Sequence, residues 1–392
     1  MGNWKTCTIA DLGMVVGGAT PSTKEAENYD GGTIAWITPK DLAGYSGRFI
    51  SHGERDITEI GLHSCSAQMM PRHSVLFSSR APIGYVAIAE NELCTNQGFK
   101  SVVPNEHTDY MFLYYLLLNN RQRIEHMGSG TTFKEVSGKT MRSIEVRVPE
   151  SKEEQIRISS ILSTIDDKIE ENERINKNLL QQMESLYKAW FTDFIPFGGS
   201  RPSDWRKSDI YSIADIIYGA PFSSKLFNTD GEGIPIIRIR DLRDQAFVTY
   251  TTENHPKGHL IQAGDIVVGM DGEFRPYIWG NTEAWLNQRV CIFNNKRPKG
   301  KAFVLFTIKP LLYRIEQTQV ATTVIHIGKK DYDAFELYLP DSNTLDQFDE
   351  LTSPMIDQIV VNRLENKRLA TLRDSLLPRL MSGELDVSDI DL

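Results

Sequence analysis

The chain has 392 residues, of which 40% are hydrophobic and 24% are charged, and its formal net charge at pH 7 is −9. A chain of this length accommodates two or more domains, and this composition is typical of soluble globular proteins. The longest apolar run, residues 111–118, is too short to cross a bilayer, and the four scattered cysteines favour a reducing cytoplasm over a disulfide-forming compartment.

Residues 1–150 are predicted to form a first, mostly β domain. Gly and Pro divide this segment into short runs of strand-like composition, and the last run alternates strictly between apolar and polar side chains. The one stretch of helical character is Met111–Arg123. The predicted strands include residues 35–37, 74–77, 85–89 and 144–148.

Residues 151–196 are predicted to form a long helix. Apolar and asparagine side chains follow a continuous 4-3-4-3 spacing, which is the a/d seam of a coiled-coil helix. No Gly or Pro interrupts this pattern before Pro196. The seam consists of Ile158, Leu162, Ile165, Ile169, Asn172, Asn176, Leu179, Met183, Leu186 and Trp190.

Residues 197–340 repeat the first domain. Most of the recurring strings lie 191 residues apart, as Asn96-Gln97 and Asn287-Gln288 do. A period this long is too great for a solenoid and indicates a duplicated module, which suits an asymmetric target read at two places. Other recurring strings are Ile9-Ala10-Asp11 with Ile213-Ala214-Asp215, Asp41-Leu42 with Asp241-Leu242, Arg123-Ile124-Glu125 with Arg314-Ile315-Glu316, and Thr131-Thr132 with Thr322-Thr323.

Residues 341–392 are predicted to form a second long helix and a tail. The first seam recurs about 190 residues later and keeps both asparagines, as Asn362 and Asn366. Polar seam residues cost stability but fix register, so the two Asn-x-x-x-Asn steps are expected to align with each other. The alternative is that the asparagines are only tolerated and solvated. The other members of this seam are Phe348, Thr352, Met355, Ile359, Leu369, Arg373, Leu376 and Leu380.

The order of these segments along the chain predicts how they are arranged. The first helix leaves the first domain and delivers the chain to the second, so the second helix can pair with it only by running back. The helices are therefore expected to be antiparallel, with the β-rich domains at opposite ends and a pseudo-twofold axis between them. The tail after Leu380 is expected to return to the first domain, near Trp4.

Two strings imitate catalytic motifs and fail on position. Ser137-Gly138-Lys139-Thr140 resembles the end of a phosphate-binding loop, but Phe133 stands where that loop needs a glycine. Asp341, Glu365 and Lys367 imitate a nuclease carboxylate set, but Asp341 precedes the helix that carries the other two. Zinc-site spacings, glycine-rich cofactor turns, methyltransferase loops and catalytic triads are not recognisable in the sequence. The sequence therefore predicts no catalytic residue, no metal site and no cofactor bound by this chain.

Loops at equivalent places in the two repeats carry small hydrogen-bond donors and cations. Hydroxyls, backbone N–H groups and Lys or Arg hold phosphates, while Arg, Asn and Gln can read base edges. A solvated surface is the alternative for any single loop, and the recurrence in both repeats favours DNA binding. The net negative charge is only a weak objection, because it averages over parts with different roles. The candidate DNA-binding residues are Thr20, Ser22, Lys40, Ser79, Arg80, Thr131, Thr132, Lys134, Ser223, Ser224, Arg238, Arg240, Arg275 and Tyr277.

Several strings, in this order and over essentially the whole chain, resemble the specificity subunits of type I restriction–modification systems. These strings are Gly18–Ser22 with Gly31–Ile37, Gly128–Lys134, Pro149 with Glu154-Gln155, Met270–Arg275, Asn287–Val290, and Leu376-Leu377 with Ser382–Leu385. The resemblance implies an α+β fold with two pseudo-repeated, mostly β target recognition domains joined by two long antiparallel coiled-coil-like helices. The corresponding boundaries are residues 1–150 and 197–340 for the domains, and 151–196 and 341–392 for the helices.

The resemblance also implies a function and partners. A subunit of this kind is not an enzyme itself; it reads a bipartite target in double-stranded DNA, each domain reading one half. Its helices bind two modification subunits, which carry S-adenosylmethionine, and the assembly recruits motor–nuclease restriction subunits, on which ATP and Mg are expected. Two competing classes stay open: a self-contained DNA methyltransferase or nuclease, and a coiled-coil scaffold that binds only proteins.

The second repeat departs from the family pattern. Gln319-Val320-Ala321 stands where the first repeat has Gly128-Ser129-Gly130, and Arg373 occupies the seam position that Met183 holds in the first helix. These departures leave open whether the two domains make equivalent DNA contacts. Apolar residues off the seam are expected to face another protein, because a two-helix seam cannot bury them. These residues are Ile161, Ile175, Val360 and Val361.

Overall fold

The structure is a computed structural model that describes residues 3–129, 134–272, 274–318 and 326–387. The chain divides into two compact units. Unit 1 consists of Met1–Glu170 and Leu369–Leu392, and unit 2 of Glu171–Arg368. This division passes through both long helices, whereas the sequence predicted four segments with the helices counted separately, and those four boundaries stay a prediction.

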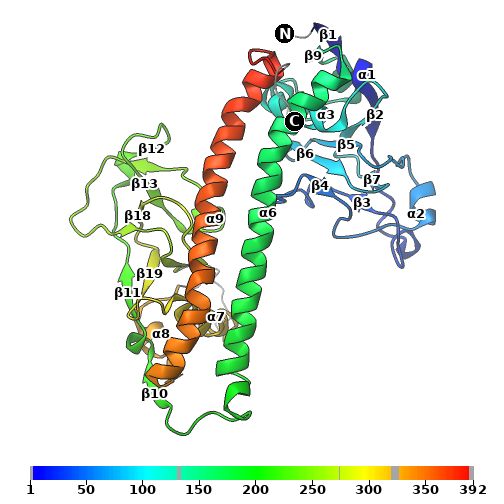
Figure 1. Ribbon diagram of the computed structural model, residues 1–392. Coiled ribbons are helices and arrows are strands. Elements are labelled where there is room, and N and C mark those ends of the chain that lie inside the picture. The colour runs from blue at the N-terminus through cyan, green and yellow to red at the C-terminus, as the bar shows by residue number, and fades with distance from the viewer. Residues whose placement is uncertain (1–2, 130–133, 273, 319–325, 388–392) are drawn as a thin grey trace. The chain divides into compact units, whose positions relative to one another are not determined.

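Unit 1 combines short strands, short helices and parts of the two long helices (Figure 1). Its strands are β1 (Trp4–Thr8), β2 (Gly13–Gly17), β3 (Trp36–Ile37), β4 (Phe49–Ile50), β5 (Val75–Ser79), β6 (Ile83–Ala89), β7 (Cys94–Thr95), β8 (Lys100–Pro104) and β9 (Glu145–Pro149). Its helices are α1 (Ile9–Leu12), α2 (Glu59–His63), α3 (Tyr110–Asn119), α4 (Arg121–His126), α5 (Gly138–Ser143), the first part of α6 (Lys152–Phe191) and the last part of α9 (Ser342–Ser382).

Unit 2 has a matching set of elements. Its strands are β10 (Arg206–Asp209), β11 (Ala214–Tyr218), β12 (Phe227–Asn228), β13 (Ile234–Ile237), β14 (Tyr250–Thr251), β15 (Leu260–Ile261), β16 (Ile266–Gly269), β17 (Pro276–Ile278), β18 (Ala284–Leu286), β19 (Val290–Asn295) and β20 (Glu336–Leu339). Its helices are α7 (Lys301–Thr318), α8 (Lys329–Asp333) and the remaining parts of α6 and α9.

The two units share a common arrangement of strands, although unit 1 adds β4 to its main sheet and unit 2 extends the β13–β18 pair with β12, β14 and β15. The sheet order β2-β8-β5-β6 in unit 1 recurs as β11-β19-β16-β17 in unit 2. The antiparallel pair β1–β9 recurs as β10–β20, and the parallel pair β3–β7 recurs as β13–β18. The predicted duplication, with mixed helix and strand content in each copy, is therefore confirmed.

The helical content of the first domain was underestimated from the sequence. The stretch Met111–Arg123 is two helices, α3 and α4, because the side chain of Asn120 donates a hydrogen bond to the Leu116 carbonyl and ends the first of them. The string 137–140 is a helix start: the Ser137 hydroxyl accepts a hydrogen bond from the Thr140 backbone N–H at 3.0 Å. Helices as short as α1, α2 and α5 leave no periodic signal to read.

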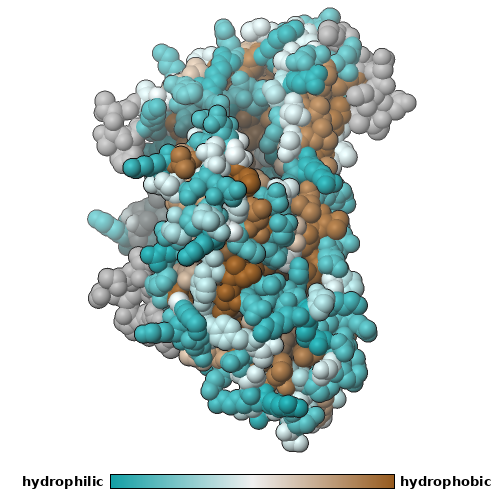
Figure 2. All heavy atoms as spheres, turned by 90° about the vertical axis from the view of Figure 1, so that its left-hand side faces the viewer, coloured by the Kyte–Doolittle hydropathy of each residue, from teal (hydrophilic) through white to brown (hydrophobic). Residues whose placement is uncertain are grey.

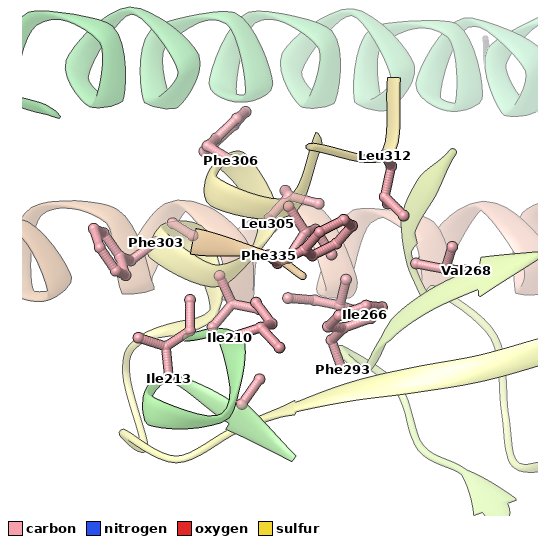
Figure 3. Packing of buried hydrophobic residues seen from close by; sticks show 14 of the residues in the cluster. Ile210, Ile213, Ile266, Val268, Phe293, Phe303, Leu305, Phe306, Leu312 and Phe335 are labelled. Carbon is pink, nitrogen blue, oxygen red and sulfur yellow. The ribbon is translucent and has the colours of Figure 1, made fainter. Parts of the chain in front are cut away.

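The core of unit 2 forms where α7, the strands and the long helices meet. Figure 3 shows Phe303, Leu305, Phe306 and Leu312 of α7 converging with β16 and β19 side chains and with Phe335. Tyr187 of α6 closes this core, with ring centroids 5.9 Å from those of both Phe303 and Phe306. Burial of this many aromatic and aliphatic side chains is what fixes the domain to the helices.

The long helices run antiparallel, as the asparagine seam predicted. In unit 2, Asn172 donates a hydrogen bond from Nδ2 to Asn366 Oδ1, and Asn362 donates from Nδ2 to Asn176 Oδ1, both at 2.8 Å. The predicted alignment of the two Asn steps is confirmed, and the alternative of solvated asparagines is wrong. Every seam residue named above is buried or half-buried. The helix α6 stops at Phe191, short of the predicted Pro196.

We expect the paired asparagines to behave differently in single and double variants. Asn176→Leu should lower the free energy of unfolding by about 1–3 kcal/mol, because it leaves the Asn362 amide, 3% exposed, without its acceptor. The double variant Asn176→Leu/Asn362→Leu should recover this loss, since two apolar side chains replace both polar partners. Urea denaturation measures both. A double variant as unstable as the single one would contradict the explanation.

One arginine in each unit ties the strands to a long helix. In unit 1, Arg48 is 4% exposed and donates from Nε to Glu170 of α6 at 2.8 Å and from Nη2 to Asp167. In unit 2 the direction is reversed, because Arg363 of α9 donates to the Ile278 carbonyl at the end of β17. Both contacts hold a sheet against the helix that leads to the next part of the chain.

The tail packs on the first unit, as predicted. Gly383 lies against the Trp4 indole, where an added Cβ would come within 2.8 Å of the ring. Arg147 Nη1 donates to the Ser382 carbonyl at 3.2 Å, and Val387 is 2% exposed in the core of unit 1.

Figure 2 shows hydrophilic side chains over most of one face, with hydrophobic side chains in separate patches between them. Among the described residues, no helix has the length and apolar character needed to span a membrane.

Candidate DNA-recognition site

The candidate loops of unit 1 are held together by a set of backbone hydrogen bonds that we call the loop frame. Ala19 N–H donates to the Thr95 carbonyl at 3.0 Å, and Asn96 N–H donates to Ile37 at 2.9 Å. The end of β5 joins them, because Ser79 N–H donates to Gly98 at 2.7 Å. Finally, Val136 N–H donates to the Ser79 carbonyl at 3.0 Å. Five segments that are far apart in sequence therefore meet in this frame.

Unit 2 builds the same loop frame from equivalent residues. Ala220 N–H donates to Leu286 at 3.1 Å, and Asn287 N–H donates to Ile237 at 3.3 Å. Met270 N–H donates to Arg289 at 2.9 Å, and Ile327 N–H donates to Met270 at 2.9 Å. The backbone that carries the loops is thus the same in both units, and only the side chains mounted on it differ.

A glycine is required at one point of each loop frame. A Cβ on Gly18 would lie 2.1 Å from the Thr95 carbonyl oxygen, and a Cβ on Gly219 would lie 2.0 Å from the Asn287 carbonyl oxygen. Only glycine allows the two backbones to approach this closely. This explains why the string that begins with Gly18 recurs at Gly219.

Charged side chains surround the loop frame of unit 1. Arg80 Nη1 lies 3.6 Å from Glu135 Oε2, and Lys100 Nζ lies 3.3 Å from Glu135 Oε1. The Thr20 hydroxyl donates a hydrogen bond to Gln97 Oε1, and Lys134 is exposed beside Glu135. Cations, an amide and a hydroxyl, which are the groups that contact phosphates and base edges, are therefore gathered in one place.

Unit 2 places a different charge pattern at the equivalent positions. Asp271 follows Met270 as Arg80 follows Ser79, and its Oδ1 lies 2.6 Å from His326 Nδ1 and 3.6 Å from Arg289 Nη1. The same imidazole nitrogen lies 3.1 Å from Arg289 Nη1. It donates to Asp271 when it carries the proton and accepts from Arg289 when it does not.

The structure brings some of the predicted DNA-binding residues to the loop frames and leaves others elsewhere. Thr20, Arg80 and Lys134 lie on the frame of unit 1, and Arg238 follows β13 on the frame of unit 2. Ser22, Lys40, Ser223, Ser224 and Arg240 are exposed or half-buried on adjoining loops, and Lys40 pairs with Glu54 at 2.6 Å. Thr131 and Thr132 lie outside the described residues.

Three predicted residues have structural partners of their own. Ser79 is a strand residue rather than a loop residue, and its buried hydroxyl donates to the Gly98 carbonyl at 3.1 Å, which argues against a direct DNA contact. Arg275 donates from Nη2 to Glu316 of α7 at 3.0 Å, and this hydrogen bond lowers the pKa of the Glu316 carboxyl. Tyr277 is half-buried in β17 and packs against the core cluster that contains Val267 and Ile292.

The sequence reasoning missed four charged residues of the loop frames: Glu135, Asp271, Arg289 and His326. The sequence did contain a signal for these residues, because Asp271 lies 191 residues after Arg80 and His326 lies 191 residues after Glu135, which is the repeat distance. The residues in each of these pairs differ in chemical type, so recurring identical strings do not reveal them.

The apolar residues expected to face another protein are only in part available for it. Ile161 packs against the core of unit 1 and Val360 against that of unit 2, because the β-rich domains cover helix faces that a two-helix seam leaves open. Val361 is 57% exposed, and Ile175 is half-buried. In the described part of the chain, no three His, Cys, Asp or Glu side chains are grouped as a metal site would require.

Comparison with known proteins identifies the family. A family model described as "Type I restriction modification DNA specificity domain" matches residues 1–181 and 202–372, so each repeat carries one copy. The MjaIX specificity subunit of Methanocaldococcus jannaschii is 32% identical over 99% of this chain and 95% of its own length. The chain belongs to the type I restriction enzyme specificity subunits. It is therefore a DNA-specificity component and not itself an enzyme.

Two further relatives agree with this assignment. The HindI specificity subunit of Haemophilus influenzae is 23% identical over 70% of this chain and 77% of its own length. The crystal structure of a type I specificity subunit from M. genitalium superposes with a TM-score of 0.58 at 16% identity, covering 97% of this chain and 96% of that one, which supports the fold.

Proposed function

We propose that this specificity subunit reads a bipartite target in double-stranded DNA, with one half-site bound by the loops of each unit. The observation that carries this proposal is the repeated loop frame, which presents cations beside other polar side chains in both units on the same backbone. Two equivalent sites with unlike side chains suit two half-sites of different sequence. The long helices α6 and α9 then set the distance between the half-sites.

The helices are also the proposed docking surface for partner subunits. Large hydrophobic side chains are exposed on α9, with Leu351 at 49%, Val361 at 57% and Leu372 at 47%. A shallow hollow along α6 is lined by Asn178, Gln181, Gln182, Ser185, Leu186 and Ala189. Exposed apolar side chains of this kind favour a protein partner. We assign these surfaces to two modification subunits, and the assembly to a cytoplasmic complex that recruits motor–nuclease subunits.

Chemistry is assigned to the partners rather than to this chain. S-adenosylmethionine is expected on the modification subunits, and ATP and Mg on the motor–nuclease subunits. A gel-shift experiment with mixed-sequence and target DNA, with and without modification subunits, tests the assignment. Sequence-selective binding by the assembled complex is the expected result. Uptake of labelled S-adenosylmethionine by the isolated chain would favour an enzyme, and failure of the complex to bind DNA would favour a protein-only scaffold.

Lys134 is expected to contact a phosphate of the first half-site. Losing one phosphate contact should weaken binding about evenly over all sequences and reduce the slope of log affinity against log salt by about one. The matched control is Lys207→Ala, which removes an exposed lysine paired with Glu336 at 2.8 Å on the β10–β20 ribbon. An unchanged salt slope in Lys134→Ala would remove Lys134 from the interface.

A further inference from the structure

Comparison of the two loop frames shows which residues are the same in both repeats and which residues differ. Gly18, Asn96 and Gln97 recur as Gly219, Asn287 and Gln288, and the hydrogen bonds around them recur as well. Three neighbouring positions change completely in character: Arg80 becomes Asp271, Glu135 becomes His326, and Gly98 becomes Arg289. If both units read DNA through the same frame, identical residues cannot distinguish one half-site from the other. The differing residues must do so.

Despite these changes, each frame keeps one guanidinium next to one carboxylate. The distance from Arg80 Nη1 to Glu135 Oε2 is 3.6 Å, and the distance from Arg289 Nη1 to Asp271 Oδ1 is also 3.6 Å. The two pairs are assembled from non-equivalent positions. A structural salt bridge inherited through duplication would occupy equivalent positions in both units. A shared function that requires a guanidinium beside a carboxylate in each unit explains the two pairs better.

Neither pair is sealed in the protein interior. The side chains of Arg80 and Glu135 are 35% and 38% exposed, and those of Arg289 and Asp271 are 53% and 24% exposed. Each carboxylate also has a second nitrogen neighbour, the Lys100 ammonium in unit 1 and the His326 imidazole in unit 2. The second neighbour holds the carboxylate in place when the arginine turns toward a ligand.

A guanidinium beside a carboxylate matches the major-groove edge of one G·C base pair. Arginine donates to guanine O6 and N7, and a carboxylate accepts from the cytosine N4 amino group. Guanine O6 and cytosine N4 are hydrogen-bonded to each other, so they lie about 2.9 Å apart. Two side-chain groups 3.6 Å apart can therefore engage both bases of one pair at the same time.

We propose that Arg80 with Glu135, and Arg289 with Asp271, are specificity-determining pairs that each read one G·C base pair, one in each half-site. This proposal rests on the proposed function, because it requires that the loop frames face DNA. The polarity of the pair is reversed between the frames: the arginine follows β5 in unit 1, whereas the carboxylate follows β16 in unit 2. The same backbone thereby serves two different half-sites.

The test uses the full chain assembled with its modification subunits. The methylated motif is determined in cells that carry Arg80→Ala, Glu135→Ala, Arg289→Ala or Asp271→Ala, and binding is measured on duplexes in which each base pair is substituted in turn. Arg80→Ala should lower discrimination at one G·C pair of the first half-site by about ten- to a hundredfold. Glu135→Ala should relax the same base pair, and the second half-site should be read as before.

The two variants should also have opposite effects on mixed-sequence DNA. Arg80→Ala should weaken this binding, because a cation near the phosphates is lost, and Glu135→Ala should strengthen it, because a repelling carboxylate is lost. A merely structural salt bridge would give the same effect from either side. Arg289→Ala and Asp271→Ala should behave in this way at the second half-site, while Lys207→Ala leaves the motif unchanged.

Several results would overturn the proposal. An even loss of affinity in Arg80→Ala without relaxation at any position would make Arg80 a phosphate contact. Relaxation of an A·T pair, or of different pairs by Arg80→Ala and Glu135→Ala, would also sink it, as would loss of reading at both half-sites from one variant. A wild-type motif without a G·C pair in either half-site would refute this inference alone. A wild-type complex that selects no sequence would refute the proposed function itself.

Discussion

Lengthening both long helices by one heptad is expected to move methylation to targets whose half-sites lie about three base pairs further apart. Seven residues extend a helix by about 10 Å, which corresponds to roughly three base pairs at about 3.4 Å each. A heptad keeps both seams in phase. Three base pairs also turn the duplex by roughly 100°, so some affinity should be lost even at the best new spacing.

The asparagine pairs decide where the heptads belong. Asn176 lies opposite Asn362, and Asn172 lies opposite Asn366. An insertion after Glu170 of α6 is therefore matched by one after Arg368 of α9, so that both pairs stay on the same side of the inserted segments and Arg363 keeps its contact with the Ile278 carbonyl. A heptad in α6 alone is the control, because it misaligns the seams and should abolish sequence-specific methylation. Methylation by the double insertion that persists only at the original spacing would show that the helices do not set the distance.

Asp166→Ala is expected to destabilise unit 1 by about 3 kcal/mol. Asp166 is 5% exposed and accepts hydrogen bonds from Arg373 Nη1 at 2.7 Å and from the Tyr115 hydroxyl at 2.5 Å. Burial raises the pKa of Tyr115, so its hydroxyl keeps the proton that it donates. Removing the carboxylate leaves the buried Tyr115 hydroxyl without its acceptor and takes from the largely buried Arg373 guanidinium one of its two carboxylate partners, the other being Asp374. Urea denaturation of the full chain measures the loss.

Two further variants show whether the loss comes from breaking the Asp166–Arg373 pair. Asp166→Leu/Arg373→Leu should recover most of the stability, because both charges leave the interior together. Arg174→Ala removes an arginine that is paired with Glu171 at 2.7 Å but exposed, and should leave the stability nearly unchanged. If Asp166→Ala were no worse than Arg174→Ala, the network around Asp166 would contribute nothing to the fold.

The long helices were predictable because their signal is local and periodic. Seam positions recur about once in every turn of α6 and α9, and most of them are apolar. One exception, such as Arg373 in the second seam, therefore does not hide the pattern. The partner of that arginine was not predictable, because Asp166 lies off the seam and reaches Arg373 only through the antiparallel pairing. The register of the two helices could be predicted only from the asparagines, which a search for apolar residues alone would not include.

The candidate site was predictable as a set of loops but not as a set of partners. The loops around Gly18 and Asn96 could be located because similar residues recur in the second repeat. They recur because the close approach of two backbone segments requires the same residue types in both units. Which side chains face one another depends on strand pairing over long sequence distances, as between Arg80 and Glu135. Ser79 shows where a prediction from residue type fails. Serine is common in loops, yet β5 continues through Ser79 and its hydroxyl is buried.

The tail of the chain has a consequence for the order in which the protein is made. The core of unit 1 contains Leu377, Leu380 and Val387, whereas unit 2 is the continuous segment Glu171–Arg368. At about 5–20 residues per second, a ribosome needs roughly 10–40 s to pass through that segment. When Arg368 has been added, unit 2 therefore has all of its residues, whereas unit 1 still lacks Leu377, Leu380 and Val387 of its core. The part synthesised first is completed after the second, and its apolar surface stays uncovered until the residues that follow Arg368 have been made.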